Sequence, residues 1–176
     1  MKLKSQLMTT EEIVRALKRI AHQIAEKNNG VENVVVIGIK NGGVPIAHQL
    51  KNNLHVIEGI EVPLGFLDIS GHRDDITEDA IIDADSKLPF DVTGKDVVLV
   101  DDVLYTGRTA RAALDAVSEN GRAGTIQLAV LIDRGHRELP IRADYVGKNI
   151  PTSRSETITI DFDETGTKPV VNIYDN

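Results

Sequence analysis

Two consecutive carboxylates, Asp101 and Asp102, are the residues whose type and spacing most directly suggest chemistry. They follow the aliphatic run 97–100, and the turn after them, 105–109, carries threonine hydroxyls, a glycine and an arginine. An alanine-rich stretch at helical spacing comes next, so the unpaired amides at the start of a helix would favour a phosphate bound at the turn. Carboxylates repel phosphate but suit a neighbouring sugar diol or Mg²⁺. The pattern therefore predicts a sugar-phosphate site.

Other interpretations of the acid pair remain open at this point. An Asp-Asp pair at the end of a strand is often only a helix cap or part of a surface loop. A response-regulator receiver also has an acid pair after an aliphatic strand, but near the start of its domain, whereas this pair lies past the midpoint of the chain. A Walker A loop is excluded, because neither GxxxxGK[ST] nor GxGxxG occurs.

Aliphatic runs separated by helical patterns predict the elements that position these residues. Uninterrupted β-branched and aliphatic runs are typical of strands buried on both faces of a parallel sheet. The predicted strands cover 34–37, 61–69, 97–100 and 126–132, and an alternating β-hairpin covers 157–162 and 170–174. We therefore expect one α/β domain over 1–176, with a central, mostly parallel sheet flanked by helices and a small hood of terminal segments.

The helix boundaries are predicted from capping signals. Thr9 and Glu12 form a capping box that opens a helix running to about Lys27. A second helix is expected to end at about Lys51, and Gly121 is placed to cap the end of the helix that follows the acid pair.

Composition limits the kind of protein this can be. The chain of 176 residues contains no cysteine, no apolar run long enough to span a membrane and no signal-peptide pattern, so we expect a cytoplasmic protein. The net charge of −7 is concentrated in 71–91 and 156–176. The remainder of the chain is slightly basic, so net charge alone does not exclude RNA binding.

Residues 98–109 closely resemble the phosphoribosyl pyrophosphate (PRPP) motif of type I phosphoribosyltransferases. Together with 131–140 and 141–149, they resemble the PyrR family, bacterial pyrimidine-operon attenuators that are also uracil phosphoribosyltransferases. The resemblance covers almost the whole chain. It implies a type I phosphoribosyltransferase fold, conversion of uracil and PRPP to UMP and pyrophosphate, Mg²⁺ bound with PRPP, and a homodimer or larger homo-oligomer. It also implies a leader mRNA bound under the control of UMP or UTP.

The resemblance assigns roles to individual residues. Asp101 and Asp102 would hold the ribose hydroxyls or the metal, and Arg73 would offset charge on the leaving pyrophosphate; no side-chain nucleophile is needed. The uracil would be held near Arg134 and Val146, mainly by backbone groups. The PRPP and UMP contacts would come from Lys40, Asn41, Gly42, Gly43, Val103, Leu104, Tyr105, Thr106, Gly107, Arg108 and Thr109.

Two loops depart from the family pattern. The glycine-rich turn 38–45 is by itself equally consistent with a plain strand-to-helix connection, and the resemblance identifies it as the pyrophosphate loop. Relatives commonly have an arginine where Gly42 stands. The acidic stretch 70–90 is predicted to be a mobile loop that closes on PRPP, and here Gly71 and His72 replace a larger pair that includes a tyrosine.

Basic residues on the first helix and in the segment 133–154 suggest an RNA surface. From the pattern alone, the basic residues of the helix could equally form its solvated face, and those of 133–154 could be ordinary surface charge. The residues that match the RNA-binding positions of the family are Arg15, Lys18, Arg19, His22, Arg137, Arg142 and Lys148. An RNA-binding regulator with weak or lost catalysis and a purine phosphoribosyltransferase remain alternative functions.

Overall fold

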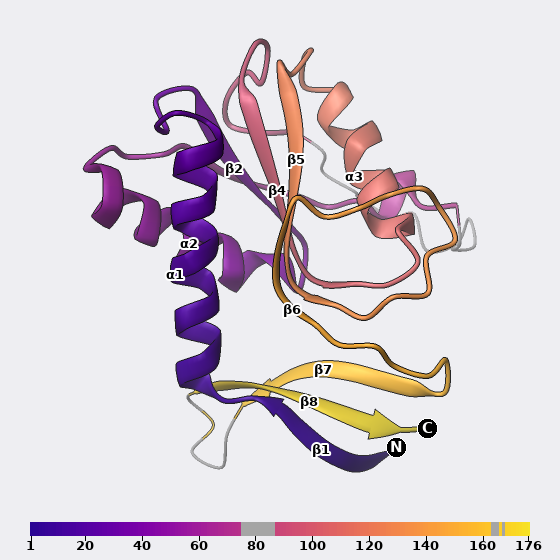
Figure 1. The fold of residues 1–176 in the computed structure, drawn as a ribbon. Coiled ribbons are helices and arrows are strands. Elements are labelled where there is room, and N and C mark those ends of the chain that lie inside the picture. The colour runs from indigo at the N-terminus through magenta and orange to yellow at the C-terminus, as the bar shows by residue number, and fades with distance from the viewer. Residues whose placement is uncertain (75–86, 163–165, 167) are drawn as a thin grey trace.

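The computed structural model describes residues 1–74, 87–162, 166 and 168–176, and its main layer is a five-stranded sheet with the order β3-β2-β4-β5-β6 (Figure 1). Every neighbouring pair in this sheet is parallel, which confirms the predicted α/β class. The strands are β2 (Val34–Ile39), β3 (Leu64–Leu67), β4 (Asp96–Leu104), β5 (Thr125–Asp133) and β6 (Tyr145–Asn149).

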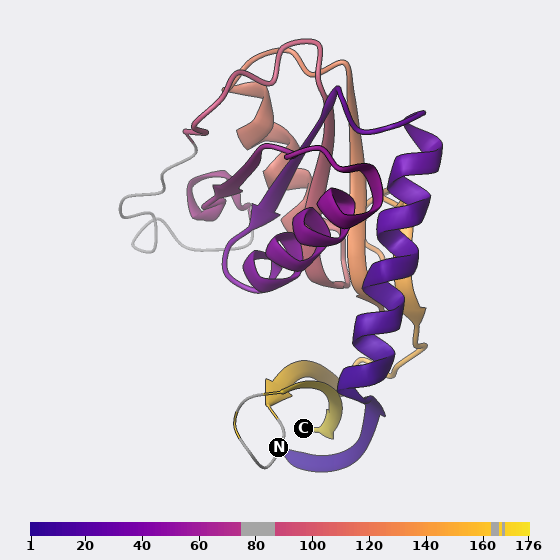
Figure 2. The same cartoon turned by 90° about the vertical axis from the view of Figure 1, so that its left-hand side faces the viewer.

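Helices cover both faces of the parallel sheet (Figure 2). The first two, α1 (Thr10–Lys27) and α2 (Gly43–Glu58), pack on one face with Val98 and Val100. The third, α3 (Arg108–Ser118), packs on the other face with Val97 and Leu99. Successive residues of β4 therefore belong to opposite cores, as expected for a strand that is buried on both sides.

A second sheet joins the two ends of the chain beside the main layer (Figure 1). It contains β1 (Lys2–Met8), β8 (Pro169–Asp175) and β7 (Glu156–Phe162), in that order, and both pairings are antiparallel. The β7–β8 hairpin confirms the prediction, although its turn at 163–165 and 167 lies outside the described residues. The β1 strand was not predicted, because residues 2–6 are all exposed and show no inward-facing alternation.

Several predicted boundaries were wrong. The second helix continues past Lys51 to Glu58, because Asn53 and Leu54 are buried along it and Gly59, with φ of 69°, ends it. The third strand is limited to Leu64–Leu67 rather than 61–69. Helix α3 ends at Ser118 with Glu119 as its cap, so Gly121 is not the cap. Strand β6 (Tyr145–Asn149) was not predicted either, because its sequence YVGKN contains no continuous apolar run.

The start of α1 confirms the predicted capping box. Glu12 donates its backbone N–H to the Thr9 hydroxyl at 3.3 Å, and the Glu12 carboxylate accepts the Thr9 N–H at 2.8 Å. None of the described helices is long and apolar enough to cross a membrane. The short 3₁₀ turn Ser70–His72 follows β3, and 75–86, most of the predicted closing loop, lies outside the described residues.

Candidate active site

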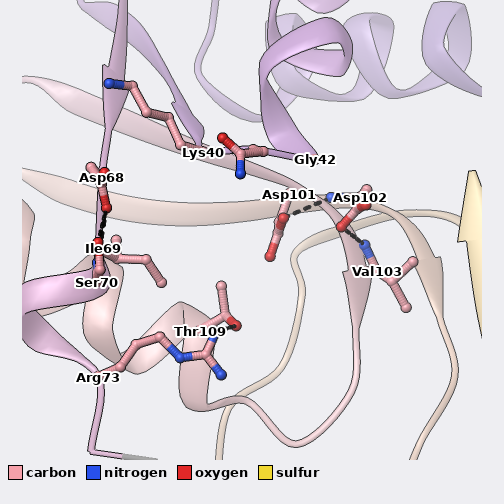
Figure 3. Close-up of a pocket in the computed structure, with 11 residues that line it drawn as sticks. Lys40, Gly42, Asp68, Ile69, Ser70, Arg73, Asp101, Asp102, Val103 and Thr109 are labelled. Carbon is pink, nitrogen blue, oxygen red and sulfur yellow. Dashed lines mark hydrogen bonds between the residues drawn. The ribbon is translucent and has the colours of Figure 1, made fainter. Parts of the chain in front are cut away.

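A polar cavity of about 400 Å³ lies where the carboxyl ends of β2, β3 and β4 meet (Figure 3). In open α/β sheets, this edge is where ligands bind. The loops after β2 and β3, the last residues of β4 and the start of α3 contribute its walls. The lining residues are Lys40, Asn41, Gly42, Asp68, Ile69, Ser70, Arg73, Asp101, Asp102, Val103 and Thr109.

The two aspartates predicted to hold the ribose lie side by side at the back of this cavity. Asp101 Oδ1 accepts the Asp102 N–H at 2.9 Å, and Asp102 Oδ1 accepts the Val103 N–H at 2.7 Å. Burial, together with the neighbouring Asp102 carboxylate, raises the pKa of the Asp101 carboxyl well above the ordinary value of 3.8. Bringing these charges together costs free energy, which a bound cation or hydroxyl donors would offset.

The glycine-rich turn between β2 and α2 lies directly against the acid pair. A Cβ placed on Gly42 would be 2.2 Å from Asp102 Oδ2, and one placed on Gly43 would be 2.2 Å from the Val100 carbonyl oxygen. Both distances are far below van der Waals contact, so only glycines let the turn approach β4 this closely. The cavity wall at this point is therefore backbone, as a pyrophosphate loop requires.

The turn between β4 and α3 is the segment predicted to cradle a phosphate, and that role stays a prediction. Gly107 has φ of 93°, a conformation that favours glycine, and it forms the N-cap of α3. The Thr106 hydroxyl accepts the Arg108 N–H at 3.3 Å. The Arg108 guanidinium instead pairs with Glu138 at 2.8 Å and Asp74 at 3.0 Å, so this side chain ties two loops together.

Six of the eleven residues predicted to contact the nucleotide do not line the cavity: Gly43, Leu104, Tyr105, Thr106, Gly107 and Arg108. The Leu104 side chain is buried in the core on the α3 face. The Tyr105 ring stacks under the Arg134 guanidinium, 4.0 Å from the ring centroid. The side chains of Leu104 and Tyr105 therefore serve packing, and their carbonyls already accept hydrogen bonds from the Arg134 N–H and the Arg137 guanidinium.

Arg73 faces the cavity from the end of the 3₁₀ turn after β3. Its guanidinium donates to the Thr109 hydroxyl at 3.4 Å, and Figure 3 shows these two side chains directed at each other beside the acid pair. Asp68 also lines the cavity but was not predicted, and its Oδ1 accepts the Ser70 N–H at 3.0 Å. Hydrogen bonds from Ser70 lower the pKa of the Asp68 carboxyl, which keeps it charged. An acid directly after a strand was the available signal.

The two residues predicted for uracil lie apart. A second hollow is lined by 133–137 and 149–152, and Arg134 belongs to it. Only 6% of Arg134 is exposed, and its guanidinium donates to the carbonyls of Ser153 at 3.0 Å and Glu156 at 2.7 Å. Val146 does not line this hollow, and its carbonyl accepts a hydrogen bond from Arg19 at 3.1 Å.

The predicted RNA residues also divide into groups. Arg15, Arg19 and Lys148 line one groove between α1 and β6, and Lys18 and His22 are exposed on the same helix. The remaining two lie elsewhere. The Arg137 guanidinium is engaged by the Tyr105 and Ile141 carbonyls and by Asp133, whereas Arg142 lines a separate hollow beside α3. These residues therefore do not share one hollow, and their assignment to one RNA surface stays a prediction.

The donor set suits Mg²⁺ bound together with a phosphorylated ligand. Among the described residues, no cluster of three or more His, Cys, Asp or Glu side chains could hold a metal alone. Mg²⁺ is commonly bound by one or two carboxylates plus substrate phosphates and water, and Asp101 and Asp102 supply such carboxylates at the cavity wall. These residues therefore fit the ion without forming a complete site.

Comparison with known proteins decides the family. The sequence matches the phosphoribosyl transferase domain over residues 4–164. It is 52% identical to the bifunctional protein PyrR of Deinococcus radiodurans over 174 residues, which cover 98% of this chain and 95% of the relative. It is 54% identical to the protein of the same name from Brevibacillus brevis over 173 residues, covering 97% and 96%. This chain belongs to the PyrR family.

Solved structures agree with this fold assignment. A Trypanosoma cruzi hypoxanthine phosphoribosyltransferase superposes with a TM-score of 0.75 at 22% identity, covering 99% of this chain and 98% of that one. A Staphylococcus aureus hypoxanthine phosphoribosyltransferase gives 0.74 at 23% identity, covering 97% and 91%. At these identities the similarity establishes the phosphoribosyltransferase fold for this PyrR chain. It does not identify the base that the chain uses.

Proposed function

We propose that this chain transfers the phosphoribosyl group of PRPP to uracil, giving UMP and pyrophosphate, and that it also binds a pyrimidine-operon leader mRNA under the control of UMP or UTP. The observation that carries the enzymatic half is the convergence, in one cavity, of the Gly42 turn, the Asp101–Asp102 pair, Arg73 and Thr109. Membership of the PyrR family supports both halves.

Catalysis would consist of positioning and charge stabilisation, without a side-chain nucleophile. As the bond between the anomeric carbon and pyrophosphate breaks, positive charge develops on the ribose and negative charge on the leaving group. Asp101 and Asp102 would hold the ribose hydroxyls or the metal, while Lys40 and Arg73 would face the leaving pyrophosphate. Mg²⁺, when bound with PRPP, would neutralise part of the pyrophosphate charge.

The enzymatic proposal is tested by replacing both aspartates with asparagine and measuring UMP formation from PRPP and uracil. We expect turnover to fall at least a hundredfold, because the ribose loses both of its charged partners. Asp115→Asn is the matched control, because Asp115 is exposed on α3, away from the cavity, and pairs with Arg111 at 3.3 Å. Normal turnover by the folded double variant would overturn the assignment. Hypoxanthine and guanine as competing bases test the purine alternative.

The RNA-binding half rests on the groove between α1 and β6. Arg15, Arg19 and Lys148 present three cations there, with Glu12 as the acid on the same wall. Cations spaced along a groove suit the phosphates of an RNA backbone. Binding of a structured leader RNA, measured with and without UMP, tests this half. A regulator that has lost catalysis would bind RNA yet form no UMP, so the two measurements separate the alternatives.

A further inference from the structure

The end of helix α3 does not line the candidate active-site cavity. It contacts the chain on both sides of residues 75–86. His72 Nε2 lies 2.7 Å from a carboxylate oxygen of Glu119, and the Leu88 N–H donates to Asn120 Oδ1 at 2.8 Å. Glu119 and Asn120, which are adjacent at the end of α3, therefore bind residues on either side of 75–86. The first of these bound residues, His72, is the neighbour of Arg73.

The hydrogen bond between His72 and Glu119 has a defined direction. A carboxylate oxygen can only accept, so His72 Nε2 must carry the proton. Within the described part of the chain, the buried His72 Nδ1 has no hydrogen-bond partner.

Further contacts hold the backbone around Arg73 to the same helix. Arg111 donates from its guanidinium to the His72 carbonyl at 3.3 Å, and Arg108 pairs with Asp74 at 3.0 Å. The residues on both sides of Arg73 are thus bound to α3. Only 15% of the His72 side chain is exposed, so this anchor is also packed.

We propose that Glu119 is a positioning residue for the phosphoribosyl transfer: through His72 it holds Arg73 at the distance from Thr109 and the acid pair at which its guanidinium meets the pyrophosphate of PRPP. Asn120 supports the same arrangement from the far side of the segment. The inference rests on the proposed function and adds two residues outside the cavity.

The test compares Glu119→Ala with Glu119→Gln, which keeps an oxygen that can accept the His72 Nε2–H. We expect Glu119→Ala to lower kcat/KM for PRPP about tenfold and to weaken PRPP binding, because a displacement of a positioned group by a fraction of an ångström has effects of this order. Glu119→Gln should stay within about twofold of wild type. Equal loss in both variants would overturn the hydrogen-bonded route through His72.

A double-mutant cycle separates positioning from general stability. If Glu119 acts through Arg73, Glu119→Ala has no further effect on kcat/KM in an Arg73→Ala background, whereas additive effects would overturn the inference. Ser118→Ala is the matched control, since it removes only a hydrogen bond to the Leu114 carbonyl at the same helix end. It should leave PRPP binding unchanged.

Failure of the inference and failure of the proposed function give different results. Wild-type protein that neither binds PRPP nor forms UMP would overturn the proposed function itself. Wild-type protein that binds PRPP, with Glu119→Ala binding it equally well, would overturn the role of Glu119 alone. Isothermal titration with PRPP and Mg²⁺ makes this distinction even when turnover is slow.

Discussion

The carboxylate of Asp102 occupies the space that a side chain at Gly42 would need. A Cβ on Gly42 would lie 2.2 Å from Oδ2 and 2.4 Å from Cγ of Asp102. The backbone of Gly42 has φ of −64° and ψ of −30°, which any residue can adopt, so the requirement for glycine is one of space. A side chain at this position would require the Asp102 carboxylate to leave its hydrogen bond with the Val103 N–H.

Gly42→Ala is therefore expected to reduce activity more than stability. To make room, the Asp102 carboxylate must rotate away from Val103, and kcat/KM for PRPP should fall about tenfold or more. Gly43→Ala is the informative comparison, because its Cβ would meet the Val100 carbonyl, which cannot move without distorting β4. That variant should lose roughly 1–3 kcal/mol in the free energy of unfolding. An alanine at 42 with wild-type kinetics would contradict this account.

The raised pKa of Asp101 predicts how stability changes with pH. A carboxyl whose folded pKa lies above its unfolded value holds its proton more tightly when folded, so stability falls as pH rises from about 3.8 through the folded value. Asp101→Asn should remove this loss. We expect the variant to match wild type near pH 3 and to be more stable than wild type at neutral pH. Chemical denaturation across this range measures the difference.

Removing the Arg134 guanidinium should destabilise the contact between the loop after β5 and the second sheet. It donates to Thr152 Oγ1 and to the Ser153 and Glu156 carbonyls, and it stacks on Tyr105. Arg134→Met keeps the chain length but leaves these acceptors unsatisfied, which should cost about 3 kcal/mol. Thermal unfolding measures this cost. Arg122→Met, at an exposed position, should change the melting temperature little.

The division of the basic residues predicts unequal effects on RNA binding. Arg15→Gln and Lys148→Gln alter the groove between α1 and β6, so each should weaken RNA binding and reduce the slope of log K against log salt by about one. Arg142→Gln alters a separate hollow and should have a smaller effect. Filter binding at several salt concentrations compares them. An equal loss for Arg142→Gln would show that the RNA surface extends over both regions.

Local pattern was enough to predict most of the secondary structure and to direct attention to the Asp101–Asp102 pair that lines the polar cavity. The aliphatic run before Asp101 indicated a strand buried on both faces, and Thr9 with Glu12 indicated the start of a helix, because both signals depend on nearest neighbours in the chain. The acid pair followed by Gly107 indicated a phosphate site for the same reason. Strand β1 was not predicted, because it is formed by pairing with β8 from the opposite end of the chain and not by a local pattern.

Tertiary structure alone decided which side chains serve the site and which serve the fold. Arg108 and Arg137 have the charge of ligand-binding residues, yet their partners are Glu138, Asp74 and Asp133, which come close only after the loops are packed. The need for glycine at 42 depends on a carboxylate far along the chain, and so does the link from Glu119 to His72. Sequence determined the chemical groups of this protein, while the distances between remote segments determined their use.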